Sequence, residues 1–223
     1  MSNSKGKVAN VIGATGLVGS SLVRLLLADE RYDRVRIFVR RASGVVHEKL
    51  EEHVVDFDAP GEWQEHLTGD ELFSALGTTI RQAGSRENQY RVDYTYQWNA
   101  ARAAAANGVG RFFLVSASGA SPRSRIFYSR IKGELDEAVS GLPFAQVAIF
   151  RPSLLLGRRE KPRPGERFGE IALKAVDWIP GVSRYRGIPA ATVAAAMISV
   201  ASRPIGDRCT IFALDELFAL AGA

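Results

Sequence analysis

The sequence predicts an α/β fold, a doubly wound parallel sheet with a small C-terminal lobe, in a single domain of residues 1–223. Short β-branched runs alternate with longer segments of helical periodicity, as in strand–helix–strand units. A glycine-rich turn joins the first such strand to the first helix. The composition, 46% hydrophobic and 24% charged, is ordinary for a globular chain, so a disordered chain is not the default expectation.

The first half of the chain contains the clearest elements. An expected strand at residues 8–12 ends at Gly13, and a helix from Leu17 to Ala28 follows, with apolar residues at helical spacing. A break rich in aspartate, proline and glycine occupies residues 56–61. The further strands expected in this half are residues 35–39, 53–55 and 71–76.

The second half continues the alternation and then becomes less regular. An Ala-rich helix at 92–106 ends at Asn107-Gly108, a common C-terminal stop. The other expected elements are a strand at 112–115, a helix at 125–139, a strand at 144–150, helices at 168–176 and 192–201, and a last strand at 211–214. We therefore expect a core over about residues 1–150 and a small substrate-side lobe over 151–223.

Charge, cysteine content and hydropathy narrow the class of protein. The 29 basic and 24 acidic residues give a net charge of +5, and the arginines are scattered, so we expect no nucleic-acid partner. The lone Cys209 excludes an internal disulfide framework and favours a reducing compartment. No apolar stretch is long enough to span a bilayer, and the apolar run near the N-terminus is too short for a signal peptide. These features predict a cytoplasmic protein with no membrane partner.

The glycine-rich turn has the spacing of a dinucleotide-binding loop, Gly13-Ala14-Thr15-Gly16-Leu17-Val18-Gly19. Gly13 allows a tight turn, Gly16 lets the backbone approach a pyrophosphate, and Gly19 lets helix and strand pack closely. The helix that begins near Leu17 presents unpaired N–H groups to the anion. We therefore expect all seven residues to hold a cofactor in a Rossmann fold. The alternative is a turn that is glycine-rich for packing alone.

The end of the second strand indicates which dinucleotide would bind. An NAD site of this fold usually has an acidic residue there, which accepts a hydrogen bond from the ribose 2′-hydroxyl. This chain has Arg40 and Arg41 instead. Two guanidiniums suit a 2′-phosphate, so we expect NADP (NADPH) to be preferred over NAD. The alternative is a solvated basic strand end.

A candidate acid–base pair follows the fifth strand. Tyr128 and Lys132 lie one helical turn apart, so they share one helix face. A nearby ammonium favours the phenolate and lowers the pKa of a tyrosine. Ser116 and Ser118 lie at the carboxyl end of the preceding strand, the edge at which open α/β sheets place their active sites. The alternative is that Tyr128 packs half-buried while Lys132 is solvated.

Together, these motifs resemble the short-chain dehydrogenase/reductase superfamily in its atypical branch, and are similar to the family of the Tat-interacting oxidoreductase-like protein. The resemblance covers nearly the whole chain. Besides the glycine loop, the Arg40-Arg41 pair and the Tyr128/Lys132 pair, it rests on residues 75–79, 91–94, 116–120, 150–153 and 163–166.

The resemblance implies further site residues. Asp56 and Phe57 would flank adenine, Leu76, Gly77 and Thr78 would line the ribose side, and Pro152, Ser153 and Leu154 would close over nicotinamide. Tyr128 and Lys132 match the catalytic pair, and Ser118 best matches the catalytic serine, with Ser116 as its rival. Two departures are that the interval from Ser118 to Tyr128 is short and that neither Asn99 nor Asn107 fits the asparagine of the proton relay.

Two functions follow from these expectations. The first is an NADPH-dependent oxidoreductase that reduces a small-molecule carbonyl or quinone, with Tyr128 as the proton donor. The second is an NADPH-binding regulator or scaffold with little turnover, since relatives in this branch are discussed as regulatory proteins. A homodimer through the helices from Val92 and Arg125 is a further expectation. We expect no metal site, because His47, His53 and His66 lack a ligand spacing.

The expected lobe also carries residues that could face a substrate. Arg158 and Arg159 could attract an acidic substrate, although solvated loop charges are the commoner case. Trp178 is expected to be a packing residue in the same lobe.

Overall fold

The computed structural model describes residues 6–157, 187–204 and 206–222. Its frame is a seven-stranded sheet in the order β3-β2-β1-β4-β5-β6-β9, with every neighbouring pair parallel. The chain enters at β1, builds outward to β3, and then returns beside β1 to build the other half. This reversal is the doubly wound topology, so the predicted fold class is confirmed.

The strands occur where the sequence predicts them, with shifted ends. Their bounds are β1 Lys7–Ile12, β2 Tyr32–Val39, β3 Leu50–Val54, β4 Glu71–Ser74, β5 Arg111–Val115, β6 Gln146–Arg151 and β9 Cys209–Ala213, with a separate small sheet of β7 Leu155–Leu156 and β8 Ile188–Pro189. β2 starts three residues before the predicted strand because Tyr32 is buried against β1. The sequence did not indicate this start, since the polar residues Asp33 and Arg34 interrupt the apolar pattern.

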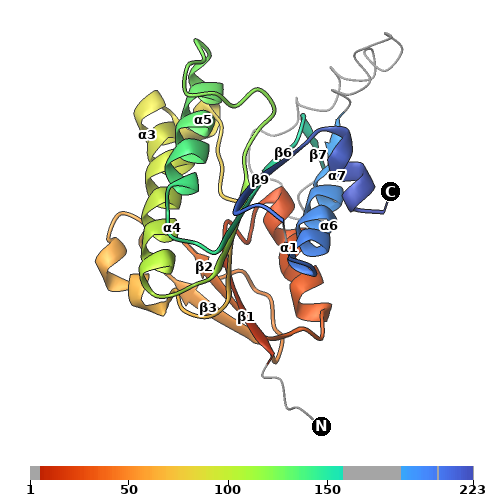
Figure 1. Ribbon diagram of the computed structural model, residues 1–223. Helices are drawn as coiled ribbons and strands as arrows, with labels where there is room; N and C mark the ends of the chain where they lie inside the picture. Colours follow the sequence, from red (N-terminus) through yellow and green to blue (C-terminus); the bar gives the residue numbers. More distant parts are fainter. Residues whose placement is uncertain (1–5, 158–186, 205, 223) are drawn as a thin grey trace.

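Helices cover both faces of the sheet, as Figure 1 shows. One face carries α1 (Leu17–Ala28), α6 (Ala190–Ala201) and α7 (Asp215–Leu220). The other carries α3 (Arg86–Tyr90), α4 (Tyr96–Ala106) and α5 (Phe127–Ser140). The sequence analysis missed several short elements, which are α2 (Ile80–Ala83), the 3-10 turns Pro60–Glu62 and Gln64–His66, the strands β7 and β8, and α7.

The helix predicted at 92–106 is longer and contains an irregularity. It starts at Arg86, where the Ser85 side chain accepts a hydrogen bond from the Asn88 N–H, and it runs to Ala106. Between α3 and α4 lies η3 (Arg91–Thr95), a turn of π-helix. The polar run before Val92 has no helical hydrophobic pattern, which is why the sequence did not reveal this first part. The π turn has consequences for the candidate site, because it contains a fully buried aspartate, Asp93.

The core consists of two layers, one on each face of the sheet. Val11 belongs to the layer beneath α1 and α6, whereas the next residue, Ile12, belongs to the layer beneath α4 and α5. Small residues line α4 and α6, so these helices can approach the sheet closely.

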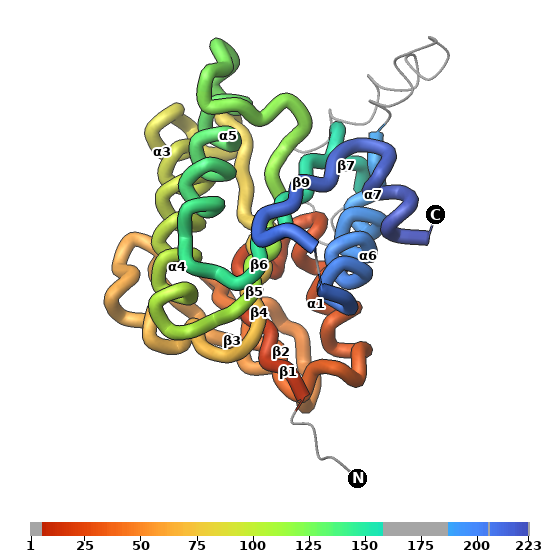
Figure 2. The backbone as a smooth tube through the Cα atoms, in the orientation of Figure 1, coloured from red at the N-terminus to blue at the C-terminus, as the bar shows by residue number. Residues whose placement is uncertain are grey.

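The described residues after 151 belong partly to this same core. β9 pairs with β6 at the sheet edge, and α6 packs against α1, although more than 160 residues separate them in the sequence (Figure 2). The helix expected at 168–176 lies outside the described residues, and the division into a core and a lobe stays a prediction.

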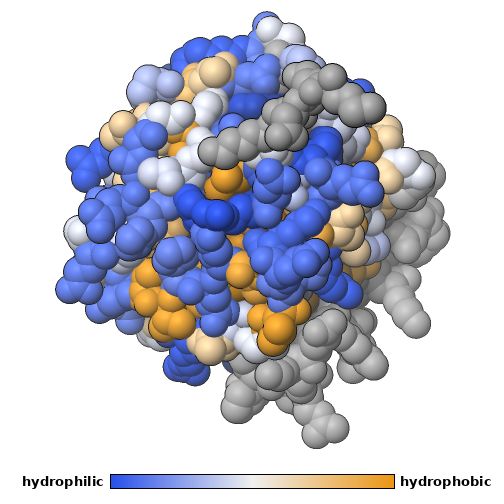
Figure 3. All heavy atoms as spheres, turned by 90° about the horizontal axis from the view of Figure 1, so that it is seen from below, coloured by the Kyte–Doolittle hydropathy of each residue, from blue (hydrophilic) through white to orange (hydrophobic). Residues whose placement is uncertain are grey.

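The amino ends of the strands are tied together by a buried carboxylate. Glu71 is fully buried and accepts from Lys7 Nζ at 2.7 Å, from Arg111 Nη1 at 3.0 Å and from the Tyr32 hydroxyl. Arg111 also donates to the carbonyls of Val200 and Ala201 and of the nearby residue 203, at the end of α6. Figure 3 views this end of the molecule from below and shows mostly hydrophilic surface with small separate apolar patches. The network joins β1, β2, β4, β5 and α6, and we interpret it as structural.

Replacing Arg111 with alanine should lower the free energy of unfolding by about 3 kcal/mol, because the buried Glu71 carboxylate loses one of its two cations and three carbonyls lose a donor. Urea unfolding followed by circular dichroism measures the change. The control Arg203→Ala removes an exposed guanidinium at the same corner and should change stability by less than about 0.5 kcal/mol. Equal stability of the two variants would show that the network contributes nothing.

Candidate active site

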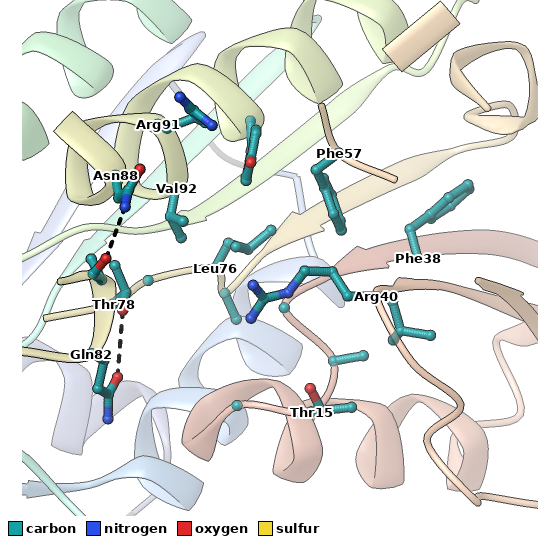
Figure 4. A pocket seen from close by; sticks show the side chains of 18 residues that line it. Thr15, Phe38, Arg40, Phe57, Leu76, Thr78, Gln82, Asn88, Arg91 and Val92 are labelled. Carbon is teal, nitrogen blue, oxygen red and sulfur yellow. Dashed lines mark hydrogen bonds between the residues drawn. The ribbon is translucent and has the colours of Figure 1, made fainter. Parts of the chain in front are cut away.

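A cavity of about 280 Å³ opens at the carboxyl ends of β1, β2 and β4. β1 is the strand at which the winding reverses, and open α/β sheets bind their ligands at this crevice. The lining residues come from the glycine turn, the end of β2, the loop after β4 and the helix that starts at Arg86 (Figure 4). They are Gly13, Ala14, Thr15, Gly16, Phe38, Val39, Arg40, Phe57, Ala75, Leu76, Gly77, Thr78, Gln82, Ala83, Asn88, Arg91, Val92 and Tyr96.

The three glycines of the turn meet three different requirements. Gly13 has φ +81°, and a Cβ there would lie 2.4 Å from the Ala75 carbonyl carbon. The Gly16 N–H donates to the Gly13 carbonyl at 2.9 Å, which closes the turn at the cavity wall. A Cβ on Gly19 would lie 2.0 Å from the Gly13 carbonyl oxygen. The turn therefore has the tight geometry that its spacing predicts.

The amino end of α1 is open toward the cavity. Gly16 is its N-cap and has no side chain with which to accept the first N–H groups, and no other side chain accepts them among the described residues. Unpaired N–H groups and the helix dipole together attract an anion. Of the seven predicted loop residues, Gly13 to Gly16 line the cavity, whereas Leu17, Val18 and Gly19 form the first turn of the helix behind it.

The two arginines after β2 differ in position. Arg40 extends from the strand end into the cavity, toward Leu76 (Figure 4). Both residues are exposed, but Arg41 does not line the cavity. No ion pair involves either guanidinium among the described residues. Arg40 is thus a cation in the cavity wall that faces no carboxylate partner there.

An aromatic cluster forms the wall beside Arg40. Phe57 is buried, lines the cavity, and packs against Trp63 and Tyr96 at ring-centroid distances of 5.1 and 5.4 Å. Asp56, its predicted companion, is exposed, and its carboxylate instead accepts from the Asp58 N–H in a local turn.

Sequence reasoning missed the polar residues Gln82, Asn88 and Arg91, which also line the cavity. Gln82 and Asn88 lie in short helices without hydrophobic periodicity, and Arg91 belongs to the motif at 91–94 but was assigned no role in the site.

Lys132 is buried, which the sequence around it does not indicate. Tyr128, in the first turn of α5, is 40% exposed, whereas Lys132 is buried. Its Nζ lies 3.0 Å from Oδ1 of Asp93, in the π turn. Burial alone would lower the pKa of Lys132, but the Asp93 carboxylate and the Tyr128 hydroxyl raise it above its usual value. Lys132 is therefore held as an ammonium ion.

Asp93 is the functional candidate that the sequence analysis passed over. The Thr78 N–H donates to its Oδ2 at 3.1 Å, which ties the cavity loop to the ion pair. A single aspartate in a helical pattern usually faces solvent, so burial could not be predicted for it. Asn107, considered for the relay, lies at the other end of α4 and donates to the carbonyls of Gln64 and Leu67.

The two candidate serines occupy different environments. Ser116 is buried beside Asp136. Burial raises the pKa of Asp136. The hydroxyl of Ser116 and the guanidinium of Arg151, which is 2.9 Å away, lower this pKa and so offset the effect of burial only in part. Ser118 is half-buried at the carboxyl end of β5, and its N–H donates to the Pro152 carbonyl at 2.8 Å. Of the two serines, Ser118 is the more exposed.

The loop after β6 does not line the cavity in its described part. Pro152 is buried, Ser153 is half-buried and Leu154 is 50% exposed. Arg158, Arg159 and Trp178 lie outside the described residues, as does the motif at 163–166.

Two features are absent from the part of the chain that the structure describes. Residues 6–157, 187–204 and 206–222 contain no group of three metal-ligating side chains. No helix within these ranges is long and apolar enough to cross a membrane.

Residues 13–139 match the model of a protein family described as NAD(P)H-binding. The matched segment runs from the glycine turn to the end of α5, so it contains every residue of the cavity as well as Tyr128 and Lys132.

Two fungal proteins are similar to this chain over most of their length. Protein fmp52, mitochondrial, from Emericella nidulans is 38% identical over 170 residues, 71% of this chain and 72% of that protein. Protein FMP52, mitochondrial, from Coccidioides immitis is 31% identical over 204 residues, 85% of this chain and 83% of that protein.

Solved structures agree on the fold. UDP-N-acetylglucosamine 4-epimerase from Methanobrevibacter ruminantium superposes with a TM-score of 0.70 at 15% identity, over 96% of this chain and 81% of that one. The oxidoreductase ylbE from Lactococcus lactis superposes with a TM-score of 0.56 at 22% identity, over 71% and 73%.

The names of the fungal relatives contradict the cytoplasmic location that the sequence analysis predicts. That prediction rested on two expectations, that the apolar run near the N-terminus is too short for a secretory signal peptide and that no apolar stretch could span a bilayer. Both are compatible with a mitochondrial protein, so they did not justify the cytoplasmic assignment, which is wrong.

Replacing Gly19 with alanine should weaken NADPH binding at least about tenfold and lower the melting temperature, because its Cβ would collide with the Gly13 carbonyl. NADPH fluorescence titration and thermal unfolding measure both effects. The control Gly61→Ala adds the same methyl group where no atom lies within 4 Å and should leave affinity unchanged. Full affinity in the Gly19 variant would show that this close approach is dispensable.

Proposed function

Because this chain belongs to the NAD(P)H-binding family, within the atypical short-chain dehydrogenases/reductases, we propose that it is an NADPH-dependent oxidoreductase that reduces a carbonyl or quinone. The observation that carries the cofactor preference is Arg40, a cation in the cavity wall for which the described residues supply no ion-pair partner. A 2′-phosphate would supply the missing negative charge.

The residues that line the cavity suit the adenine, pyrophosphate and ribose parts of a dinucleotide. The glycine turn and the open end of α1 would receive the pyrophosphate, since only backbone groups approach there. Phe57 would pack against adenine, with Arg40 beside the ribose 2′ position. Leu76, Gly77 and Thr78 would line the second ribose, on the side nearest Lys132.

NADPH supplies a hydride to the substrate when it is bound. In the proposed reaction, Tyr128 donates the proton that the substrate oxygen needs. Tyr128 is suited to this role because it is partly exposed at the carboxyl edge of the sheet, one turn before a buried ammonium. Lys132 stabilises the phenolate that is left after the transfer. Ser118, near the surface at the end of β5, would orient the substrate oxygen.

One observation favours the alternative, an NADPH-binding regulator with little turnover. The charge of Lys132 is already paired with Asp93 at 3.0 Å, so its field at Tyr128 is weaker than that of a lone ammonium. Tight cofactor binding without turnover on aldehydes, ketones or quinones would favour this second function.

Replacing Arg40 with alanine should weaken NADPH binding about 10- to 100-fold and NADH binding less than about threefold, because only NADPH carries the 2′-phosphate. Calorimetric titration with both cofactors measures the change. Arg41→Ala is the matched control, since Arg41 adjoins Arg40 but lies outside the cavity. Equal losses for the two cofactors in the Arg40 variant would remove the NADP preference.

Replacing Tyr128 with phenylalanine should abolish NADPH oxidation on a substrate panel while changing NADPH affinity less than about threefold, because only the proton donor is lost. Absorbance at 340 nm follows turnover. Tyr90→Phe, which removes a similarly exposed hydroxyl from α3, should keep full activity. Turnover that survives in the Tyr128 variant would show that another group donates the proton.

A further inference from the structure

The ion pair between Asp93 and Lys132 is almost completely buried. Their side chains are 0% and 3% exposed, and Nζ and Oδ1 are 3.0 Å apart. A buried pair of charges loses much hydration energy, so an apolar pair would often be the more stable choice. The retention of both charges at the edge of the cofactor cavity points to a role beyond stability.

Three contacts place Asp93 in position. The π turn η3 carries it inward, and its main-chain carbonyl accepts from Gln97 Nε2 at 2.9 Å. Gln97 in turn accepts from the Ser74 hydroxyl at 2.6 Å, at the last residue of β4. The carboxylate accepts from the Thr78 N–H. Asp93 is therefore anchored to the strand and to the loop that line the cavity.

Gly77, which lines the cavity, is the point at which the cavity loop comes close to the ion pair. A Cβ on Gly77 would lie 3.4 Å from Asp93 Oδ1 and 3.9 Å from Lys132 Nζ. The glycine has no side chain, so a ligand lying along this loop can come close to both charged groups. Leu76 and Thr78, on either side of it, also line the cavity.

From this arrangement we infer that Asp93 is the positioning residue for Lys132, which it holds charged and couples to the cofactor loop through the Thr78 N–H. A ligand that moves the loop at Thr78 then acts on the same carboxylate that fixes the ammonium. Asp93 touches neither the substrate nor Tyr128 in this role. It acts through Lys132 alone.

The charges around Lys132 explain why the Asp93 carboxylate decides its protonation state. Tyr128 and Asp136 face it from its own helix, and Asp93 faces it from η3. Asp136 is already bound by Arg151, which extends from β6. If Asp93 lost its charge, the burial of Lys132 would be opposed only by Tyr128 and a carboxylate shared with Arg151. The pKa of Lys132 would then fall.

This inference rests on the proposed function for its catalytic consequence but not for its test. The isosteric variant Asp93→Asn removes the charge and leaves an oxygen that can still accept from the Thr78 N–H. Asp93→Ala removes both. The matched control Glu137→Gln removes a negative charge from an exposed position on α5, the helix that carries Lys132.

The first readout is the pKa of Lys132, followed by NMR of its ¹⁵Nζ in the whole protein. In the wild type, Lys132 should stay protonated beyond the usual lysine range. In Asp93→Asn its proton affinity should fall about tenfold or more, whereas Glu137→Gln should not change it. Should Asp93→Asn not fold, the wild-type titration decides, and a Lys132 that titrates below the usual lysine range would overturn the inference.

The second readout is the dissociation constant of NADPH, which separates the effect of the Asp93–Lys132 ion pair from that of the Thr78 hydrogen bond. Asp93→Asn should bind NADPH within about threefold of the wild type, and Asp93→Ala about tenfold more weakly, because only alanine releases the Thr78 loop. Equal affinities in the two variants would overturn the coupling. A wild type that binds no NADPH would refute the proposed function while leaving the Lys132 titration to test the positioning role.

Where a substrate is found, the pH profile gives a third readout. The loss of turnover at alkaline pH should move to lower pH in Asp93→Asn, because Lys132 then loses its proton earlier. A purely structural role would lower the amount of active protein without shifting the profile, and that result would contradict the inference.

Discussion

The close approach of two backbone segments at the glycine turn is the constraint on which the rest of the site depends. Gly13 lies against the end of β4, and Gly19 lies against Gly13, at separations that leave no room for a Cβ. This contact brings the open end of α1 to the carboxyl edge of the central strands. The cavity is formed where the β2 end, the β4 loop and the π turn surround that helix end. A wider turn would move the helix end away from all three.

Much of this arrangement could be predicted because it follows from local periodicity. The strand-helix alternation gave every strand of the main sheet, and the glycine spacing gave the turn and the start of α1 at Leu17. Arg40 and Arg41 were both predicted to be at the site, and of the two only Arg40 lines the cavity. In each case the chemical type of a residue and its place after a strand carry the information, since the parallel topology brings strand ends together.

The remaining features depend on contacts between distant parts of the chain. Nothing near Asp93 in the sequence shows that it is buried against a lysine 39 positions later. Arg40 lines the cavity and Arg41 does not, and Ser116 is buried whereas Ser118 is not. Both differences arise because nearby side chains at a strand end face in different directions. Gln82, Asn88 and Arg91 reach the cavity only because the short helices after β4 fold over it.

The π turn at Arg91–Thr95 makes the site sensitive to a kind of change that substitutions do not test. A π turn contains about one more residue than an α-helical turn. Deleting one residue there would restore regular helix and rotate the two halves by about 100° relative to each other. The outer part, with Asn88, could keep its place only if Asp93 turned away from Lys132. Relatives of this chain are therefore expected to tolerate length changes in the loops before Ser85 more readily than within this turn.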